Sequence, residues 1–250
     1  MRGAILDSEC GGTLQSFHIK KHCAERDGYA LWRFLRAAIT AALEQGDERN
    51  LFHQALEQVE LADRLGFDYA WEVEHHVLEE YSHSSAPEVF LAAAAARTKA
   101  IRLGHGIRQV IPNYNHPART AEGLATLDII SDGRVDFGIG EGATRLELGG
   151  FRIPAKEKRA MALEAAEQIA NMMVLEPYPG FAGKYFTMPC RNVLPKPVQV
   201  PHPPMWMACT NRETIKIAAQ NGFGAVAMQG ETRHHGQVCV HAMTERHAGI

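Results

Sequence analysis

A carboxylate and two imidazoles stand together at Glu74, His75 and His76. They follow an apolar segment, Phe67 to Val73, that is typical of a strand, and ligands of parallel α/β proteins bind at the carboxyl ends of strands. Histidines at such a place can move a proton, contact an anionic cofactor or hold a metal. Neighbouring strand residues point to opposite faces, and the helical HExxH spacing is missing. We therefore expect no metal, and we favour proton transfer or cofactor binding over an unreactive strand end.

A glycine-rich segment, GIGEGAT at 138–144, follows another expected strand. It superficially resembles a dinucleotide loop, but a Rossmann fingerprint opens a helix at once, and here the next helix is expected only at about Lys156. The Glu141 carboxylate would also repel a phosphate. Gly140 and Glu141 are thus interpreted either as part of a loop that faces a cofactor or as an ordinary connection.

Two further segments admit both a functional and a structural interpretation. Gly104 and Gly106 stand near a strand end, where they allow a flat aromatic ligand to approach the backbone or simply form a bulge or bend. Thr210, Asn211 and Arg212 lie between an expected strand and helix. They either hold a phosphate at the helix N-terminus or cap the helix, and Arg212 favours the anion site.

The elements that must position these residues alternate between strand and helix. Expected helices are 52–65, ended by Gly66, then 87–96, opened by a Ser85–Glu88 capping box, 117–130, 156–175 and 212–221. Expected strands are 67–73, 101–107, 135–139, 205–208 and 225–228, with short ones at 1–7 and 184–187 and a helical composition at 31–43. Such alternation predicts a parallel sheet with helices outside, either a barrel or an open doubly wound sheet.

Composition excludes several classes of protein. The 250 residues carry a net charge of -3 without a basic stripe, so neither nucleic acid nor an anionic membrane is suggested as partner. No apolar run reaches the roughly 18 residues of a spanning helix, and no signal peptide is recognised. Five scattered cysteines favour a reducing, cytoplasmic location. We expect an atypical segment at 1–48, one domain at 49–229, and a poorly ordered tail at 230–250.

These motifs together resemble the bacterial luciferase-like monooxygenase family. The similarity rests on GFDYAWEVEHH at 66–76, AARTKAIRLGHGI at 95–107, HPARTAEGLATLDIISDGRVDFGIGEG at 116–142 and PKPVQVPHPPMWMACTNRETIKIAAQNGFGAVAM at 195–228. It covers about residues 50–229. The resemblance implies a (β/α)8 TIM barrel with an insertion at 148–204.

The resemblance also implies an activity. Such enzymes take reduced FMN, usually from a separate flavin reductase, and use O2 to oxidise a small organic substrate, here expected to be apolar. Relatives that use the deazaflavin F420 transfer a hydride without oxygen. Assembly as a homo-oligomer is compatible with this picture.

Residue roles carry over position by position. His75 matches the family's catalytic histidine, which transfers a proton or stabilises the oxygenated flavin. Glu74 and Gly140 would lie beside the cofactor, and Glu141 would contact substrate or share a proton. Gly106 and Ile107 match a non-proline cis peptide behind the isoalloxazine ring. The phosphate would fall on Thr210, Asn211 and Arg212.

Departures from the family pattern raise a third alternative. Luciferase carries a reactive cysteine and an arginine where this chain has Gly140 and Glu141, so Arg212 or Thr210 must supply the phosphate contact. About forty unfamiliar residues precede the helix near Leu51, and the motifs stop after Met228. We therefore expect a barrel that is incomplete at its C-terminal end, and a non-catalytic remnant is the alternative to an enzyme.

Overall fold

The computed structural model describes residues 32–35, 47–79 and 81–227. Its main feature is a six-stranded parallel sheet with the order β1-β2-β3-β4-β7-β8. The strands are β1 (Trp32–Leu35), β2 (Tyr69–Val73), β3 (Arg102–Gln109), β4 (Val135–Gly140), β7 (Met205–Cys209) and β8 (Gly224–Ala227). The order follows the chain without the reversal of a doubly wound sheet. Since β1 and β8 do not pair with each other, the described strands form an incomplete (β/α) barrel, as predicted.

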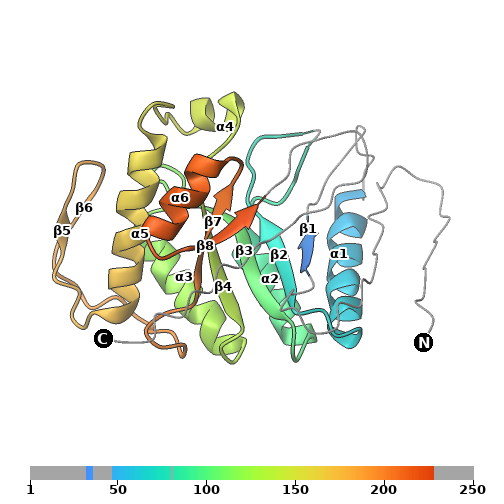
Figure 1. Ribbon diagram of the computed structural model, residues 1–250. Coiled ribbons are helices and arrows are strands. Elements are labelled where there is room, and N and C mark those ends of the chain that lie inside the picture. The colour runs from blue at the N-terminus through green and yellow to red at the C-terminus, as the bar shows by residue number, and fades with distance from the viewer. Residues whose placement is uncertain (1–31, 36–46, 80, 228–250) are drawn as a thin grey trace.

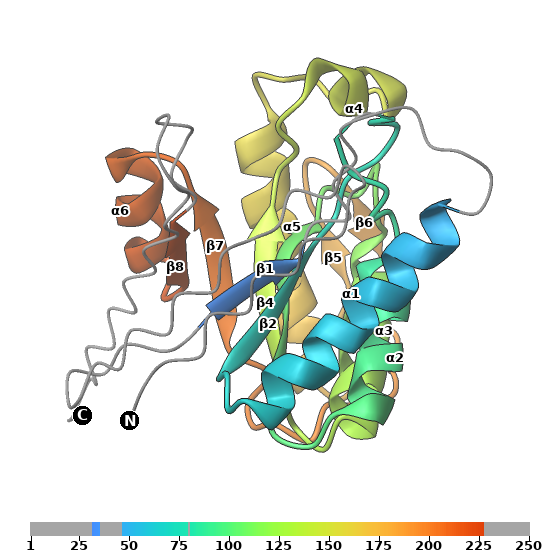
Figure 2. The ribbon, with the colours of Figure 1, turned by 90° about the vertical axis from the view of Figure 1, so that its right-hand side faces the viewer.

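Helices connect the strands and cover the sheet. They are α1 (Asp47–Arg64), α2 (Pro87–Arg97), α3 (Pro117–Ile130), α4 (Arg145–Gly150), α5 (Lys158–Val174) and α6 (Arg212–Gln220), with a small hairpin of β5 (Phe181–Ala182) and β6 (Thr187–Met188). Figure 1 shows α1 beside β1 at one end of the sheet and α6 beside β7 and β8 at the other. In the turned view of Figure 2, α4 again lies at the top of the molecule. None of the described helices has the length and apolar character needed to cross a bilayer.

Apolar side chains pack on both faces of the sheet. On the helix side, Phe137 and Ile139 belong to the large core that includes Leu124 of α3 and Ile169 of α5. On the other face, Trp71 and Trp206 meet edge to face, with ring centroids 5.7 Å apart. A Cβ atom on Gly104 would lie 2.2 Å from the Trp71 ring. The aromatic group that approaches this glycine is therefore the protein's own tryptophan.

One expected helix is a strand. The segment 31–43 was predicted to be helical, but β1 lies within it and pairs in parallel with β2, Trp32 opposite Tyr69. Trp32 and Phe34 favour strands, and tertiary pairing overrides the helical composition. Residues 36–46, the expected strand at 1–7 and the expected tail at 230–250 lie outside the described residues.

Some helix boundaries agree with the prediction from the sequence, and one does not. Gly66, at φ +76°, follows the end of α1, and α3 begins at Pro117, both as predicted. The His116 side chain caps α3 by accepting a hydrogen bond from the Ala118 amide, which was not predicted. The Ser85–Glu88 capping box is wrong, because Ala86 precedes α2 without a side-chain cap and Glu88 pairs with Arg108 instead.

The short strand expected at 184–187 is also wrong. The structure has the β5–β6 hairpin there, and Gly183 donates its amide to the Phe186 carbonyl at 3.1 Å across the turn. The residues between the two strands therefore reverse the chain, and only Thr187 of the expected segment belongs to a strand.

Candidate active site

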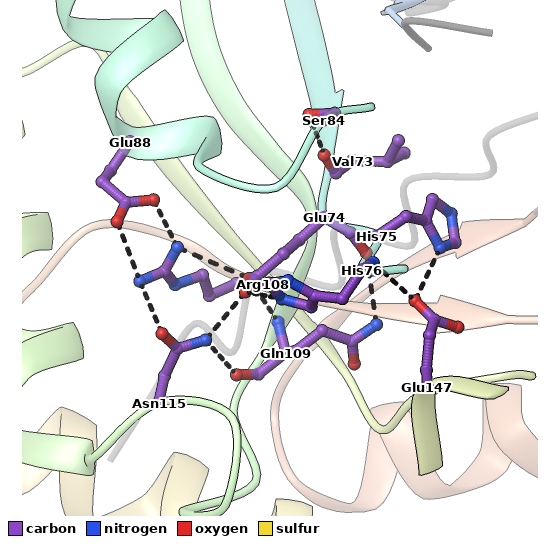
Figure 3. A network of polar contacts seen from close by, with 10 residues as sticks. All are labelled: Val73, Glu74, His75, His76, Ser84, Glu88, Arg108, Gln109, Asn115 and Glu147. Atoms are coloured by element: carbon purple, nitrogen blue, oxygen red, sulfur yellow. Dashed lines mark hydrogen bonds and ion pairs between the residues drawn. The ribbon is translucent and has the colours of Figure 1, made fainter. Parts of the chain in front are cut away.

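The carboxyl end of β2 carries the acidic and imidazole groups (Figure 3). The strand ends at Val73, so the next three residues are free of strand alternation. Glu74 and His75 are buried, and His76 is half-buried. The His75 ring meets Tyr81 edge to face at 5.1 Å, whereas His76 stacks on Tyr114 at 5.6 Å. The two histidines therefore face different surroundings, and each needs its own explanation.

The Glu74 carboxylate joins the ends of β2 and β3. It accepts hydrogen bonds from the Gln109 amide at 2.8 Å, from Asn115 Nδ2 at 2.8 Å and, with Nε2 as the donor, from His76 at 2.9 Å. Arg108 Nη1 lies 3.4 Å from its second oxygen. Figure 3 shows these groups converging on one carboxylate. Both oxygens are thus engaged by protein donors, which gives Glu74 a role in holding the site together.

His75 is held by Glu147, with 3.1 Å between Nδ1 and Oε1. Glu147 is fully buried on α4, and its Oε1 also accepts the His76 amide at 3.2 Å. Burial alone would raise the pKa of Glu147, but hydrogen bonds from His75, Thr144 and the His76 backbone lower it to about 2. An ionised carboxylate only accepts hydrogen bonds, so His75 carries a proton on Nδ1 and presents Nε2 for chemistry.

Sequence reasoning missed Glu147. The helix after the glycine-rich segment was expected at about Lys156, but α4 begins at Arg145. Its start carries a complete capping box, in which the Thr144 side chain accepts the Glu147 amide and the Glu147 side chain accepts the Thr144 amide. The Thr-x-x-Glu spacing was the available signal. The partnership with His75, 72 residues away, appears only in the folded chain.

The segment expected behind a flavin ring lies inside β3. The cis peptide predicted at Gly106–Ile107 is wrong, since the cis bonds of the described residues all precede proline. A register shift between His105 and Arg108 forms a bulge instead, and a Cβ atom on Gly138 would lie 2.2 Å from the His105 carbonyl oxygen. Such a bulge changes the direction in which the following side chains point.

Residues in and beside the bulge form an apolar rim. Val73 pairs in register with the half-buried Ile107, and the Ile107 Cγ2 atom would be 2.3 Å from a Cβ atom on Gly140. Gly106 itself is buried. The carboxyl ends of β2, β3 and β4 thus present small and apolar groups next to the strand end that carries His75.

Glu141 forms an ion pair with α5. Its carboxylate is bound by the Arg159 guanidinium through two hydrogen bonds and lies 3.3 Å from Lys158 Nζ. Burial would raise the pKa of Glu141, but Arg159 and Lys158 lower it below its usual range. The acid expected to contact substrate or share a proton is therefore held as an anion between two cations.

The turn from β7 to α6 carries the residues that were expected to bind a phosphate. Asn211 caps α6, because its Oδ1 accepts the Thr214 amide and hydroxyl, each at 3.0 Å. Thr210 and Arg212 are exposed, and within the described part of the chain Arg212 has no ion-pair partner. The expected capping role is met by Asn211, and the Arg212 charge is unused by the fold.

Comparison with known proteins agrees with this architecture. The family model described as luciferase-like monooxygenase matches residues 33–249, a longer stretch than the motifs cover. The chain belongs to the luciferase-like monooxygenase family.

Luciferase-like relatives include both flavin and deazaflavin enzymes. The oxygenase component of the flavin-dependent trigonelline monooxygenase of Acinetobacter baylyi is 32% identical over 72% of this chain and 49% of the relative. An F420-dependent glucose-6-phosphate dehydrogenase of Amycolatopsis mediterranei is 25% identical over 79% of this chain and 58% of the relative. The chain spans about half the length of the curated relatives that it matches.

Solved luciferase-like structures share the fold. The monooxygenase RslO1 from Streptomyces bottropensis has a TM-score of 0.68 and 34% identity over 78% of this chain and 58% of its own. The oxygenating constituent of 3,6-diketocamphane monooxygenase from Pseudomonas putida, solved with FMN, has a TM-score of 0.71 and 21% identity over 80% of this chain and 57% of its own.

The residues present fit the flavin that a luciferase-like protein would hold. The apolar rim of Val73, Ile107 and Gly140 suits one face of an aromatic ring. The first-turn amides of α6 and the unpaired Arg212 suit a phosphate. The negative charge of Glu141 is balanced by Arg159 and Lys158, which removes the repulsion that its sequence position suggested.

Proposed function

We propose that this chain carries the flavin site of a monooxygenase that uses reduced FMN and O2 to oxidise a small apolar substrate. The observation that carries the proposal is the His75–Glu147 pair, 3.1 Å apart, beside the apolar rim at the carboxyl ends of β2, β3 and β4. Support for a separate reductase comes from the trigonelline monooxygenase relative, which is named as an oxygenase component.

Each residue has a defined task in this proposal. Reduced flavin, when bound, supplies the electrons that O2 needs. Glu147 stays ionised and fixes the Nδ1 proton of His75, so His75 Nε2 exchanges a proton with the bound reactants. Glu74 holds the strand ends that carry the site, with its oxygens bound by Gln109 and Asn115 among others. The α6 amides and Arg212 bind the flavin phosphate.

An apolar substrate is supported by the groups around His76. Tyr114 and Phe151 lie with ring centroids 4.5 Å apart, and both rings contact His76. Burial, and then the charges of Glu147 and Glu74, raise the pKa of Tyr114, so its hydroxyl stays neutral. A substrate that reaches this cluster meets aromatic faces and a neutral phenol.

The test compares cofactors and a histidine variant. We expect protein fluorescence to be quenched by FMN at lower concentration than by F420, and substrate-dependent O2 uptake with reduced FMN. His75→Ala should lower kcat by about 10²-fold or more. His53→Ala, an exposed histidine of α1, serves as the control and should leave kcat unchanged. Tighter binding of F420 with hydride transfer but no O2 uptake would refute the monooxygenase and support the F420-dependent alternative.

A further inference from the structure

Glu72 is a buried acid that the proposed chemistry does not use. It lies on β2, two residues before Glu74, and only 2% of its surface is exposed. Within the described residues no lysine or arginine forms an ion pair with it. An ionised carboxylate without a partner is costly at such a position, so its protonation state needs an explanation.

Counting protons at Ser84 provides that explanation. The Ser84 hydroxyl oxygen lies 2.6 Å from the Val73 carbonyl oxygen and also within hydrogen-bond distance of Glu72 Oε1. A serine hydroxyl has one proton, and a carbonyl oxygen can only accept. Two short oxygen–oxygen contacts need two protons, and Glu72 is the only partner that can bring the second. A protonated Glu72 therefore donates to Ser84, which donates to Val73.

The charges around Glu72 agree with this assignment. Among the described side chains of the elements packed on β2, His105 of β3 stands in register with Glu72, and burial followed by the charge of Arg108 lowers the pKa of His105 to about 3. His105 is thus neutral, and Arg108 is engaged by Glu88 of α2 and by Glu74. Among the described side chains, no counter-charge is left for Glu72. Burial raises the pKa of Glu72 to about 8.

Ser84 links this acid to the catalytic histidine. Its carbonyl oxygen accepts the His75 amide at 2.8 Å, while its hydroxyl holds the Val73 carbonyl. The backbone on both sides of Glu74 is therefore fixed by one serine, as Figure 3 shows for its Val73 contact. We propose that Glu72 is a neutral carboxylic acid that acts through Ser84 to position His75. The positioning role rests on the function proposed above.

Protonation can be tested on the protein without flavin. Glutamine is neutral at every pH, and its amide can donate to Ser84, so Glu72→Gln mimics the protonated acid. Unfolded Glu72 ionises near 4.5 and folded Glu72 near 8, so the folded state holds the extra proton between these values. The Tm of the wild type should therefore fall relative to Glu72→Gln as pH rises from about 5 to 8, and the difference should level off above about 8. A Tm difference that is constant over this range would overturn the proposal.

Positioning is tested by nuclear magnetic resonance of the histidine ring nitrogens together with kinetics. Glu72→Ala and Ser84→Ala should shift the His75 signals and lower kcat about 10- to 100-fold with little change in KM. Glu72→Gln should restore both. Ser131→Ala, a buried serine beyond α3, is the control and should change neither. Unmoved His75 signals in the two alanine variants would overturn the positioning role. If the two alanine variants shift the His75 signals but the wild type shows no turnover, only the proposed function is refuted and the positioning role stands.

Discussion

At the scale of single residues, the surroundings of each carboxylate decide its task. Glu147 receives hydrogen bonds from His75, Thr144 and the His76 backbone, and it stays ionised although it is buried. Glu72 has one hydroxyl beside it, and burial favours its neutral form. Two acids with opposite shifts within one site are a common sign of divided acid–base roles. Here one orients the histidine ring directly and the other acts on the backbone.

The lowered pKa of Glu147 predicts how the stability of the fold changes in acid. Its pKa is lowered from 4.5 to about 2, so the unfolded state binds a proton first as pH falls. The stability that ionised Glu147 contributes is therefore complete above about pH 5 and is lost as pH falls through about 2. Over this window, the free energy of unfolding of the wild type should fall about 2–3 kcal/mol more than that of Glu147→Gln.

Urea unfolding at several pH values measures this difference. Glu157→Gln is a suitable control, because Glu157 is a partly exposed acid whose partner is Lys184. Relative to the wild type, Glu157→Gln should reduce the pH dependence of the free energy of unfolding far less than Glu147→Gln does. Parallel curves for the wild type and Glu147→Gln between pH 5 and 2 would contradict the lowered pKa of Glu147.

At the scale of elements, the site is assembled from strand ends and the turns that follow them. A bulge in β3 brings Ile107 beside Val73, and α4 begins five residues after β4, which places Glu147 over the end of β2. Gly104 lets the Trp71 ring lie flat on β3 beneath this rim. The rim therefore depends on close packing within the sheet below it.

Gly104→Ala tests that dependence. The added Cβ would lie 2.2 Å from Trp71 Cε3, so the tryptophan must move within a packed layer. We expect a loss of about 1–3 kcal/mol in the free energy of unfolding, measured by urea denaturation. Gly123→Ala, in the middle of α3 with nothing within 4 Å of the added carbon, is the matched control. It should be neutral or stabilising by about 0.5–1 kcal/mol, and an equal effect of both changes would contradict the packing argument.

The sequence pattern predicted best those helices and strands whose boundaries depend on local residues. The start of α3 follows from a local cap at His116, and the end of α1 is followed by Gly66 with a positive φ. β1 was predicted as a helix because its pairing with β2 is a tertiary contact. The His75–Glu147 pair is likewise long-range, so the sequence predicted the histidine and not its partner. The assigned flavin contacts at Ile107 and Arg212 stay predictions.

At the scale of the whole molecule, the proposed flavin site spans the sheet. The ring would rest on the ends of β2, β3 and β4, whereas the phosphate would lie at the β7–α6 turn. β4 and β7 are hydrogen-bonded neighbours, so the two parts belong to adjacent strands of one curved sheet. Lys158 and Arg159 of α5 bind Glu141 at the end of β4, which leaves Arg212 as the cation without a partner at the β7–α6 turn within the described chain.

Arg212→Ala therefore separates the phosphate contact from the ring contact. FMN carries the phosphate and riboflavin does not, so the variant should bind FMN about tenfold more weakly while its riboflavin affinity changes less than about twofold. Fluorescence titration with both compounds measures the difference, and Lys216→Ala on the next turn of α6 is the matched loss of charge. Added salt should weaken FMN binding to the wild type more than to Arg212→Ala, because only the wild type keeps the charged contact. An equal loss of FMN and riboflavin binding would mean that Arg212 supports the fold of the turn and does not hold the phosphate.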